Sequence, residues 1–192
     1  MALNIVLMYG SVRRDRQGIR AARFAEVRLK ARGHAVSFVD ALDVQLPLLD
    51  RMYKEYPKGE APDVLEKLAT LYRAADAFVI VTGEYNHGVA PALSNLLDHF
   101  LEEYYFRPSA IVSYSGGQFG GVRAAVHLQA ILCELGMPSI SSLLPIPEIG
   151  KTLDPDGMPQ EPWLSRSAKR FADELTWYAE ALRRQRAEGT PY

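Results

Sequence analysis

The chain has 192 residues, of which 48% are apolar and 23% charged, and these values are typical of a globular protein without long disordered regions. Its 22 basic and 23 acidic residues give a net charge of −1, which argues against nucleic-acid binding. The single cysteine, Cys133, excludes an intrachain disulfide and a thiolate metal site, and its apolar helical surroundings predict a buried thiol.

The N-terminal part predicts a strand, a helix and a second strand. Residues 4–9 (NIVLMY) form a continuous apolar run that stops at Gly10, which is typical of a buried strand in a parallel sheet. The run is too short, and lacks the basic flank, for a signal peptide or a membrane span, so we expect a cytoplasmic protein. Apolar residues at helical spacing predict a helix over 17–32, and residues 35–39 (AVSFV) predict the next strand.

The middle of the chain continues this alternation. Three prolines in the segment 46–62 predict a loop, which is followed by a helix over 63–74 and a strand over 77–81. The next apolar stripe begins at Val89 and continues at helical spacing to Leu101, which predicts a helix. Residues 89–106 are apolar nearly all round, which predicts burial either against another subunit or inside the chain's own core.

The C-terminal part predicts a strand within 107–114, a helix over 122–135, a short strand near 139–144 and a last helix over 163–184. Parallel strands need helical crossovers, so five strands alternating with helices predict one open parallel sheet with helices on both faces. Without a repeat or linker, we expect a single domain over residues 1–192.

Three loops follow predicted strand ends, where ligands bind in open α/β sheets. The first, GSVRRDRQG at residues 10–18, offers the Ser11 hydroxyl, three arginines and N–H groups around residues 17–19. Free N–H groups and the helix dipole favour an anion, so the loop predicts a phosphate site, with a solvated basic turn as the alternative. It matches neither the GxGxxG nor the Walker pattern.

The loops at residues 82–91 and 113–121 lack the groups for acid–base or metal chemistry. Glu84 has no second carboxylate beside it, and no histidine spacing matches a zinc site. Their glycines would let the backbone approach the edge of a flat ring, with Tyr85 or Asn86 packed beside it. We therefore expect a mononucleotide cofactor whose ring performs the reaction, with no catalytic side chain.

In these loops the chain resembles the NADPH-dependent FMN reductase family, which has a flavodoxin-like fold with strand order 2-1-3-4-5. The resemblance rests on GSVRRDRQG, on GEYNHGVAPALSNLLD at residues 83–98 and on SYSGGQFGGVRA at residues 113–124. Gly83 stands where the family usually has proline. The resemblance implies FMN contacts of three kinds: to the phosphate from Ser11, Arg13, Arg16, Gln17, Gly18 and Ile19, along the isoalloxazine from Glu84, Tyr85, Asn86 and His87, and to its pyrimidine side from Ser115, Gly116 and Gly117.

The resemblance also implies an activity. Hydride would pass from NADPH or NADH to FMN N5 and then, in a ping-pong sequence, to free flavin, a quinone, an azo compound, chromate or ferric iron. The N–H groups of residues 115–117 would stabilise charge at N1 and O2. The acceptor, the choice of nicotinamide and whether FMN is bound or exchangeable stay open. In relatives the helix after the EYN motif packs in a dimer, often within a tetramer, which implies a homo-oligomer.

Two other readings belong to different classes. A flavodoxin-type electron carrier would hold FMN without using NAD(P)H, but it would typically be acidic and would lack the EYN loop. A receiver-type regulatory domain would need an acidic cluster after the first strand, where this chain has Ser11 and arginines.

Overall fold

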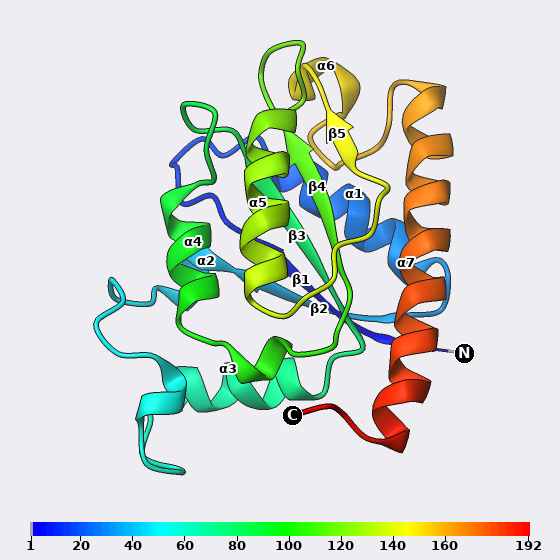
Figure 1. Cartoon of the computed structure of the whole chain (residues 1–192). Helices are drawn as coiled ribbons and strands as arrows, with labels where there is room; N and C mark the ends of the chain where they lie inside the picture. The colour runs from blue at the N-terminus through cyan, green and yellow to red at the C-terminus, as the bar shows by residue number, and fades with distance from the viewer. Residues whose placement is uncertain (1) are drawn as a thin grey trace.

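The computed structural model describes residues 2–192 and contains one five-stranded parallel sheet (Figure 1). The strand order is β2-β1-β3-β4-β5, which confirms the predicted flavodoxin-like topology. β1 lies at the point where the order reverses, paired with both β2 and β3. The strands are β1 (Asn4–Tyr9), β2 (Ala35–Asp40), β3 (Ala77–Gly83), β4 (Ser109–Tyr114) and β5 (Leu144–Ile146).

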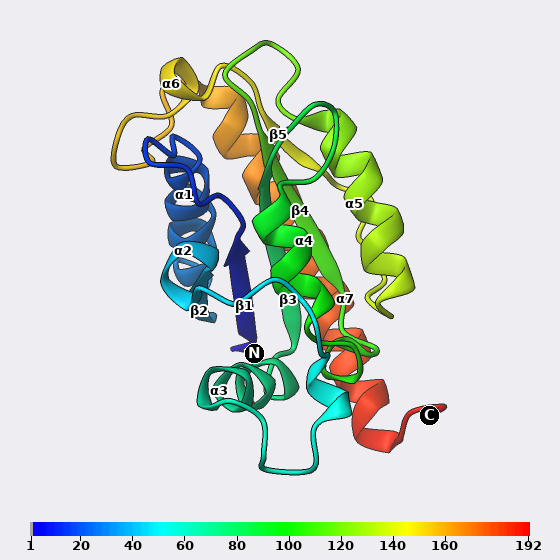
Figure 2. The same cartoon turned by 90° about the vertical axis from the view of Figure 1, so that its left-hand side faces the viewer.

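Helices cover both faces of the sheet (Figure 2). One face packs against α1 (Ile19–Lys30) and α7 (Pro162–Glu188). The other packs against α3 (Asp63–Arg73), α4 (Pro91–Asp98) and α5 (Val122–Glu134). The short elements are α2 (Ala41–Val44), α6 (Ile149–Thr152) and the 3-10 turns η1 (Tyr53–Glu55) and η2 (Glu102–Tyr104).

Alternation along each strand divides the core in two. From β1, Ile5, Leu7 and Tyr9 face α1 and α7, whereas Val6 and Met8 face the opposite helices. Since both faces of the strand are buried, its sequence is a continuous apolar run rather than an alternating one.

An aromatic cluster fills the α3 side of the core, at the amino edge of the sheet. It consists of Tyr72, Phe78, Phe100 and Tyr104, all of them fully buried. The Tyr72 and Phe100 ring centroids are 4.9 Å apart, and those of Phe78 and Tyr104 are 5.3 Å apart, both edge to face. Edge-to-face packing adds to the stabilisation from burial. The cluster joins α3, β3 and η2.

The helix after β3 is shorter than the apolar stripe predicted. It ends at Asp98, and Leu101 (φ −148°) and Phe106 (φ +59°) have non-helical backbones. Leu93 and Phe100 are nevertheless buried in this chain's own core. Of the two predicted kinds of burial, the buried residues of the stripe therefore show burial in the chain's own core. The stripe is longer than the helix because buried residues such as Phe100 follow the end of the helix.

Two expectations are wrong. The fifth strand is Leu144–Ile146 rather than the segment near 139–144, where Ser139 makes a single backbone pairing with Ser109. Cys133 is exposed rather than buried, because it lies on the outer side of α5 while Leu132 faces the core.

The segment that follows α6 packs against the outer side of α1. Gly157, at φ +82°, comes so close that a Cβ there would lie 2.7 Å from the Arg20 carbonyl oxygen. Arg20 donates a hydrogen bond to the Leu153 carbonyl at 3.0 Å, and Arg23 donates one to that of Pro155 at 3.3 Å. Glycine alone suits both this φ and this approach. The helix is thus held between the sheet and residues 153–157.

Candidate functional site

The three predicted loops meet at the carboxyl edge of the sheet, at the top of Figure 1. With Ile149 of α6 they line a pocket of about 270 Å³. The predicted contact residues in its lining are Ser11, Arg13, Arg16, Gln17, Glu84, Tyr85, Ser115 and Gly116. The other predicted residues do not line it: Gly18, Ile19, Asn86, His87 and Gly117. The lining residues that were not predicted as contacts are Asp15, Gly83, Tyr114 and Ile149.

The first loop offers backbone donors, but not where the sequence placed them. The N–H groups of Gln17 and Ile19 are used inside the loop, by the carbonyls of Asp15 and Arg16. Within residues 2–192, the N–H groups of residues 12–16 and of Gly18 make no hydrogen bond. The free donors therefore lie mainly before the helix rather than in its first turn. Such a row of N–H groups next to a helix N-terminus is suited to an anion.

The arginines of this loop have different surroundings. Arg16 forms an ion pair with Asp40 at the end of β2, with 2.5 Å between Nη1 and Oδ1, and donates to the Ser11 carbonyl at 3.3 Å. Arg13 is exposed and makes no hydrogen bond or ion pair with the rest of the described chain. Arg16 thus fixes the loop to the sheet, and Arg13 is available to a ligand.

The second loop is a tight turn. Tyr85 and Gly88 exchange two backbone hydrogen bonds, of 3.0 and 2.9 Å. Asn86 (φ +50°) and His87 (φ +67°) occupy the positions between them, as in a type I′ turn. This turn holds Tyr85 at the pocket while Asn86 and His87 are exposed at the tip.

The side chain of Glu84 connects the second loop to the third. Its carboxylate accepts from the Arg123 backbone N–H at 3.2 Å and lies 3.4 Å from the Arg123 guanidinium, at the start of α5. A carboxylate at a helix N-terminus is favoured by the helix dipole. The Glu84 side chain therefore positions the loop. Because its carboxylate is occupied by Arg123, only the backbone of Glu84 is available to contact a ring.

The third loop presents an open backbone. The Ser115 N–H donates to the Ile146 carbonyl at 3.2 Å, so it is already used. Gly116 and Gly117 donate no backbone hydrogen bond to any of residues 2–192, and a Cβ at either would meet nothing within 4 Å. Two exposed N–H groups beside open space are what a polar ring edge requires.

Tyr114, the last residue of β4, lies between the first and second loops. A Cβ at Gly18 would be 1.9 Å from its Cζ atom, and one at Gly83 would be 3.0 Å away. Glycine at position 83, in place of the family's proline, therefore makes room for this ring. Burial raises the pKa of the Tyr114 phenol, against the opposite effect of hydrogen bonding with Tyr9 and Ser11, so the hydroxyl stays protonated.

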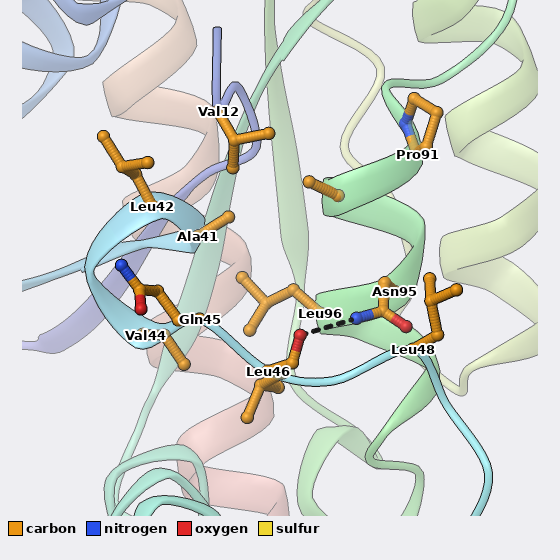
Figure 3. A pocket seen from close by; sticks show the side chains of 11 residues that line it. Val12, Ala41, Leu42, Val44, Gln45, Leu46, Leu48, Pro91, Asn95 and Leu96 are labelled. Carbon is orange, nitrogen blue, oxygen red and sulfur yellow. Dashed lines mark hydrogen bonds between the residues drawn. The ribbon is translucent and has the colours of Figure 1, made fainter. Parts of the chain in front are cut away.

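A larger hollow lies beside the first loop, between α2 and α4 (Figure 3). Its volume is about 500 Å³, and its lining includes Val12, Leu48 and Leu96 but no charged side chain. Asn95 fixes the adjoining segment to α4, donating to the Pro47 carbonyl at 2.8 Å and accepting from the Leu49 N–H at 2.9 Å. An apolar lining does not suit a phosphate. The smaller pocket is therefore the candidate cofactor site.

The longest helix is α7, which is amphipathic. Across residues 2–192, no helix combines the length and the apolar character needed to cross a membrane.

Comparison with known proteins relates most of the chain to flavin reductases. The model of the NADPH-dependent FMN reductase family matches residues 3–150, which include all three loops. A quinone reductase of Pseudomonas putida is 31% identical over 141 residues, covering 70% of this chain and 72% of that protein.

Two further similarities are more limited. An NADPH azoreductase of a Bacillus species is 37% identical over 71 residues, covering 36% of this chain; the match thus spans 40% of the azoreductase's length. The solved structure of a flavoenzyme NAD(P)H:acceptor oxidoreductase from Paracoccus denitrificans superposes with a TM-score of 0.74 at 20% identity, covering 94% of this chain and 98% of that one. At that identity the superposition supports the fold.

Proposed function

The chain belongs to the NADPH-dependent FMN reductase family, and on that premise we propose that residues 1–192 form one FMN-binding domain that reduces small-molecule acceptors with NAD(P)H. One observation carries the proposal. The first loop, with its free backbone N–H groups, shares one pocket with the two glycine-containing loops that follow β3 and β4. When bound, FMN would supply the chemistry, accepting hydride at N5 from NAD(P)H and delivering it to the acceptor in ping-pong order.

The first loop fits the phosphate end of FMN. The free N–H groups of residues 12–16 and Gly18 point to an anion, and Arg13 and the Ser11 hydroxyl add donors at the same pocket. Arg16 would act mainly by holding the loop against Asp40. A charge-assisted hydrogen bond is about twice as strong as a neutral one, which suits a doubly ionised phosphate.

The second and third loops fit the isoalloxazine ring. Tyr85, held by the turn at residues 85–88, gives one wall, and the free N–H of Gly116, with that of Gly117 next to it in the chain, gives donors for the pyrimidine edge. These N–H groups would stabilise negative charge on that edge as the ring is reduced. On this proposal no side chain would need to exchange a proton, because the ring itself would carry the reaction.

The acceptor is proposed only as a class. The relatives are named for quinone and azo reduction, and we extend to this chain an acceptor that can lie on an open flavin face: a free flavin, a quinone, an azo compound, a metal oxyanion or ferric iron. We also propose that the protein acts in the cytoplasm, where NAD(P)H is supplied.

Titration of the apoprotein with FMN, followed by anaerobic addition of NADPH or NADH, tests the proposal. We expect saturable quenching of flavin fluorescence and then rapid loss of the oxidised flavin absorbance. Binding without bleaching by either nucleotide would support the electron-carrier alternative, and no FMN binding would contradict the proposed function.

Arg13→Ala is expected to weaken FMN binding roughly tenfold, because it removes an exposed charge-assisted hydrogen bond, about 1.5 kcal/mol. Arg14 is a matched control: it is also an exposed arginine of the first loop but does not line the pocket. Arg14→Ala should change the FMN dissociation constant by less than about twofold. Equal constants for wild type and Arg13→Ala would contradict the assignment of Arg13 to the phosphate.

We further propose that the chain forms a homodimer, alone or within a tetramer. The interface would be the apolar surface around the larger hollow between α2 and α4. Val12, Leu42, Leu48 and Leu49 are exposed there, Leu48 by 86%. Val12, Leu42 and Leu48 line this hollow together, and an exposed apolar surface of this kind would be suited to burial in an oligomer (Figure 3).

Leu48→Glu is expected to raise the dimer dissociation constant by about 100-fold or more, because a carboxylate would be buried in an apolar interface. Light scattering after size exclusion would show a shift toward the monomer. Met158→Glu, on an exposed methionine outside this surface, is the control and should leave the mass unchanged. A monomeric wild type, or an unchanged Leu48→Glu oligomer, would contradict this interface.

A further inference from the structure

The helix that begins at the proposed phosphate site has no side-chain cap. Gly18 is the N-cap residue of α1 and makes no side-chain hydrogen bond. Helix N-termini usually have a Ser, Thr, Asp or Asn at this position, whose oxygen lies beside the first free N–H groups. The first turn of α1 therefore lacks the polar atom that such a residue would provide.

The phenol of Tyr114, the last residue of β4, occupies the space that a side chain at position 18 would take. A Cβ at Gly18 would be 2.2 Å from Oη of Tyr114 and 1.9 Å from its Cζ. The hydroxyl thus lies where the side chain of residue 18 would begin, directly over the N-terminus of α1. Tyr114 is 9% exposed, and its exposed part lines the cofactor pocket.

The surroundings of this hydroxyl leave it free to donate. It interacts with the Ser11 hydroxyl and with Tyr9, whose ring centroid is 6.4 Å from that of Tyr114. Both neighbours are hydroxyl groups, which can accept as well as donate. Tyr9 itself is oriented toward the Arg16 carbonyl, at 3.5 Å. No carboxylate hydrogen-bonds to the Tyr114 phenol within the described chain.

We propose that the Tyr114 hydroxyl donates a hydrogen bond to a phosphate oxygen of FMN, in place of the N-cap side chain that Gly18 lacks. The inference rests on the proposed function, since it assigns the phosphate end of that same site. It makes Tyr114, the last residue of the strand that leads into the third loop, a residue that binds the phosphate.

Tyr114→Phe tests the inference because it keeps the ring between Gly18 and Gly83 and removes only the hydroxyl. We expect the FMN dissociation constant to rise about 10- to 100-fold, the usual effect of losing a hydrogen bond to a charged group. The dissociation constant for riboflavin, which has no phosphate, should change less than about twofold. Tyr72→Phe is the control, since the Tyr72 hydroxyl is fully buried, distant from the pocket and without a hydrogen-bond partner among residues 2–192.

The outcomes separate this inference from the proposed function. A wild type that binds no FMN would overturn the proposed function. Wild-type binding with an equal affinity in Tyr114→Phe would overturn the inference alone. An equal loss of FMN and riboflavin affinity would also overturn it, because the phenol would then act on the ring or on the fold.

A second pair of variants tests whether Tyr114 stands in for residue 18. Tyr114→Ala empties the space over Gly18 and should weaken FMN binding at least as much as Tyr114→Phe. Adding Gly18→Ser to Tyr114→Ala supplies an N-cap hydroxyl directly, and we expect it to recover at least about tenfold of the lost affinity. Circular dichroism would check that the double variant is folded. If the folded double variant recovers no FMN affinity, the Tyr114 hydroxyl does not take the role of an N-cap side chain at position 18.

Discussion

Replacing Gly116 with valine is expected to leave the fold intact and to weaken FMN binding roughly 10- to 100-fold, the effect of about 1–3 kcal/mol of overpacking. A Cβ at Gly116 meets open space in the protein alone, so the substitution has no neighbour to disturb. If the edge of the flavin ring lies against this backbone, the added carbons would occupy its place. Fluorescence titration would measure the affinity, and a thermal melt should change by no more than about 2 °C.

Gly150→Val is the matched control. Gly150 also has open space around its Cβ and an ordinary φ, but it does not line the pocket. It should leave FMN affinity unchanged. Full affinity in Gly116→Val would place the ring elsewhere, whereas a lowered melting temperature would show that the loop itself had been disturbed.

Phe100→Ala is expected to destabilise the protein by about 3–5 kcal/mol, because it removes a whole buried ring and leaves a cavity. Phe100 is fully buried, with its ring centroid 4.9 Å from that of Tyr72 and 5.7 Å from that of Tyr53. For a domain of this size the melting temperature should fall by roughly 10 °C. Below the transition FMN affinity should be unchanged, because the cluster lies at the edge of the sheet opposite the pocket.

Val126→Ala is the control for this prediction. Val126 is 58% exposed on α5, so its replacement should change the free energy of unfolding by less than about 0.5 kcal/mol. A loss of under about 1 kcal/mol in Phe100→Ala would mean that the neighbouring rings close the cavity. A lowered FMN affinity in the folded variant would mean that the cluster and the pocket are coupled.

The sequence predicts the sheet and the edge at which the three loops meet, because both depend on local patterns. Strands buried on both faces give unbroken apolar runs such as residues 4–9, and a run that stops at glycine indicates a loop at the ligand-binding edge. The stop of α4 at Asp98 was not predictable in this way. Apolar spacing reports burial, and burial continues through Phe100 and Tyr104 after the helix ends.

Contacts between distant segments account for the rest of the differences. Arg16 belongs to a basic loop in the sequence, and its partner Asp40 ends a different strand. Tyr114 is one of several residues that could end β4, and only the approach of Gly18 and Gly83 shows why a ring fits there. The sequence predicts free N–H groups around residues 17–19, but most of the free ones lie earlier in the loop. The N–H groups of Gln17 and Ile19 are already hydrogen-bonded to carbonyls within the loop.

The contact of residues 153–157 with the outer side of α1 has a thermodynamic consequence. Because Gly157 and the Arg20 hydrogen bond hold the helix from outside, its N-terminus is in place before an anion arrives. If FMN binds as proposed, the start of α1 should need little further ordering on binding. Calorimetry of FMN binding should therefore show a small entropic penalty, and loosening the outer contact should lower affinity through entropy, with the enthalpy little changed.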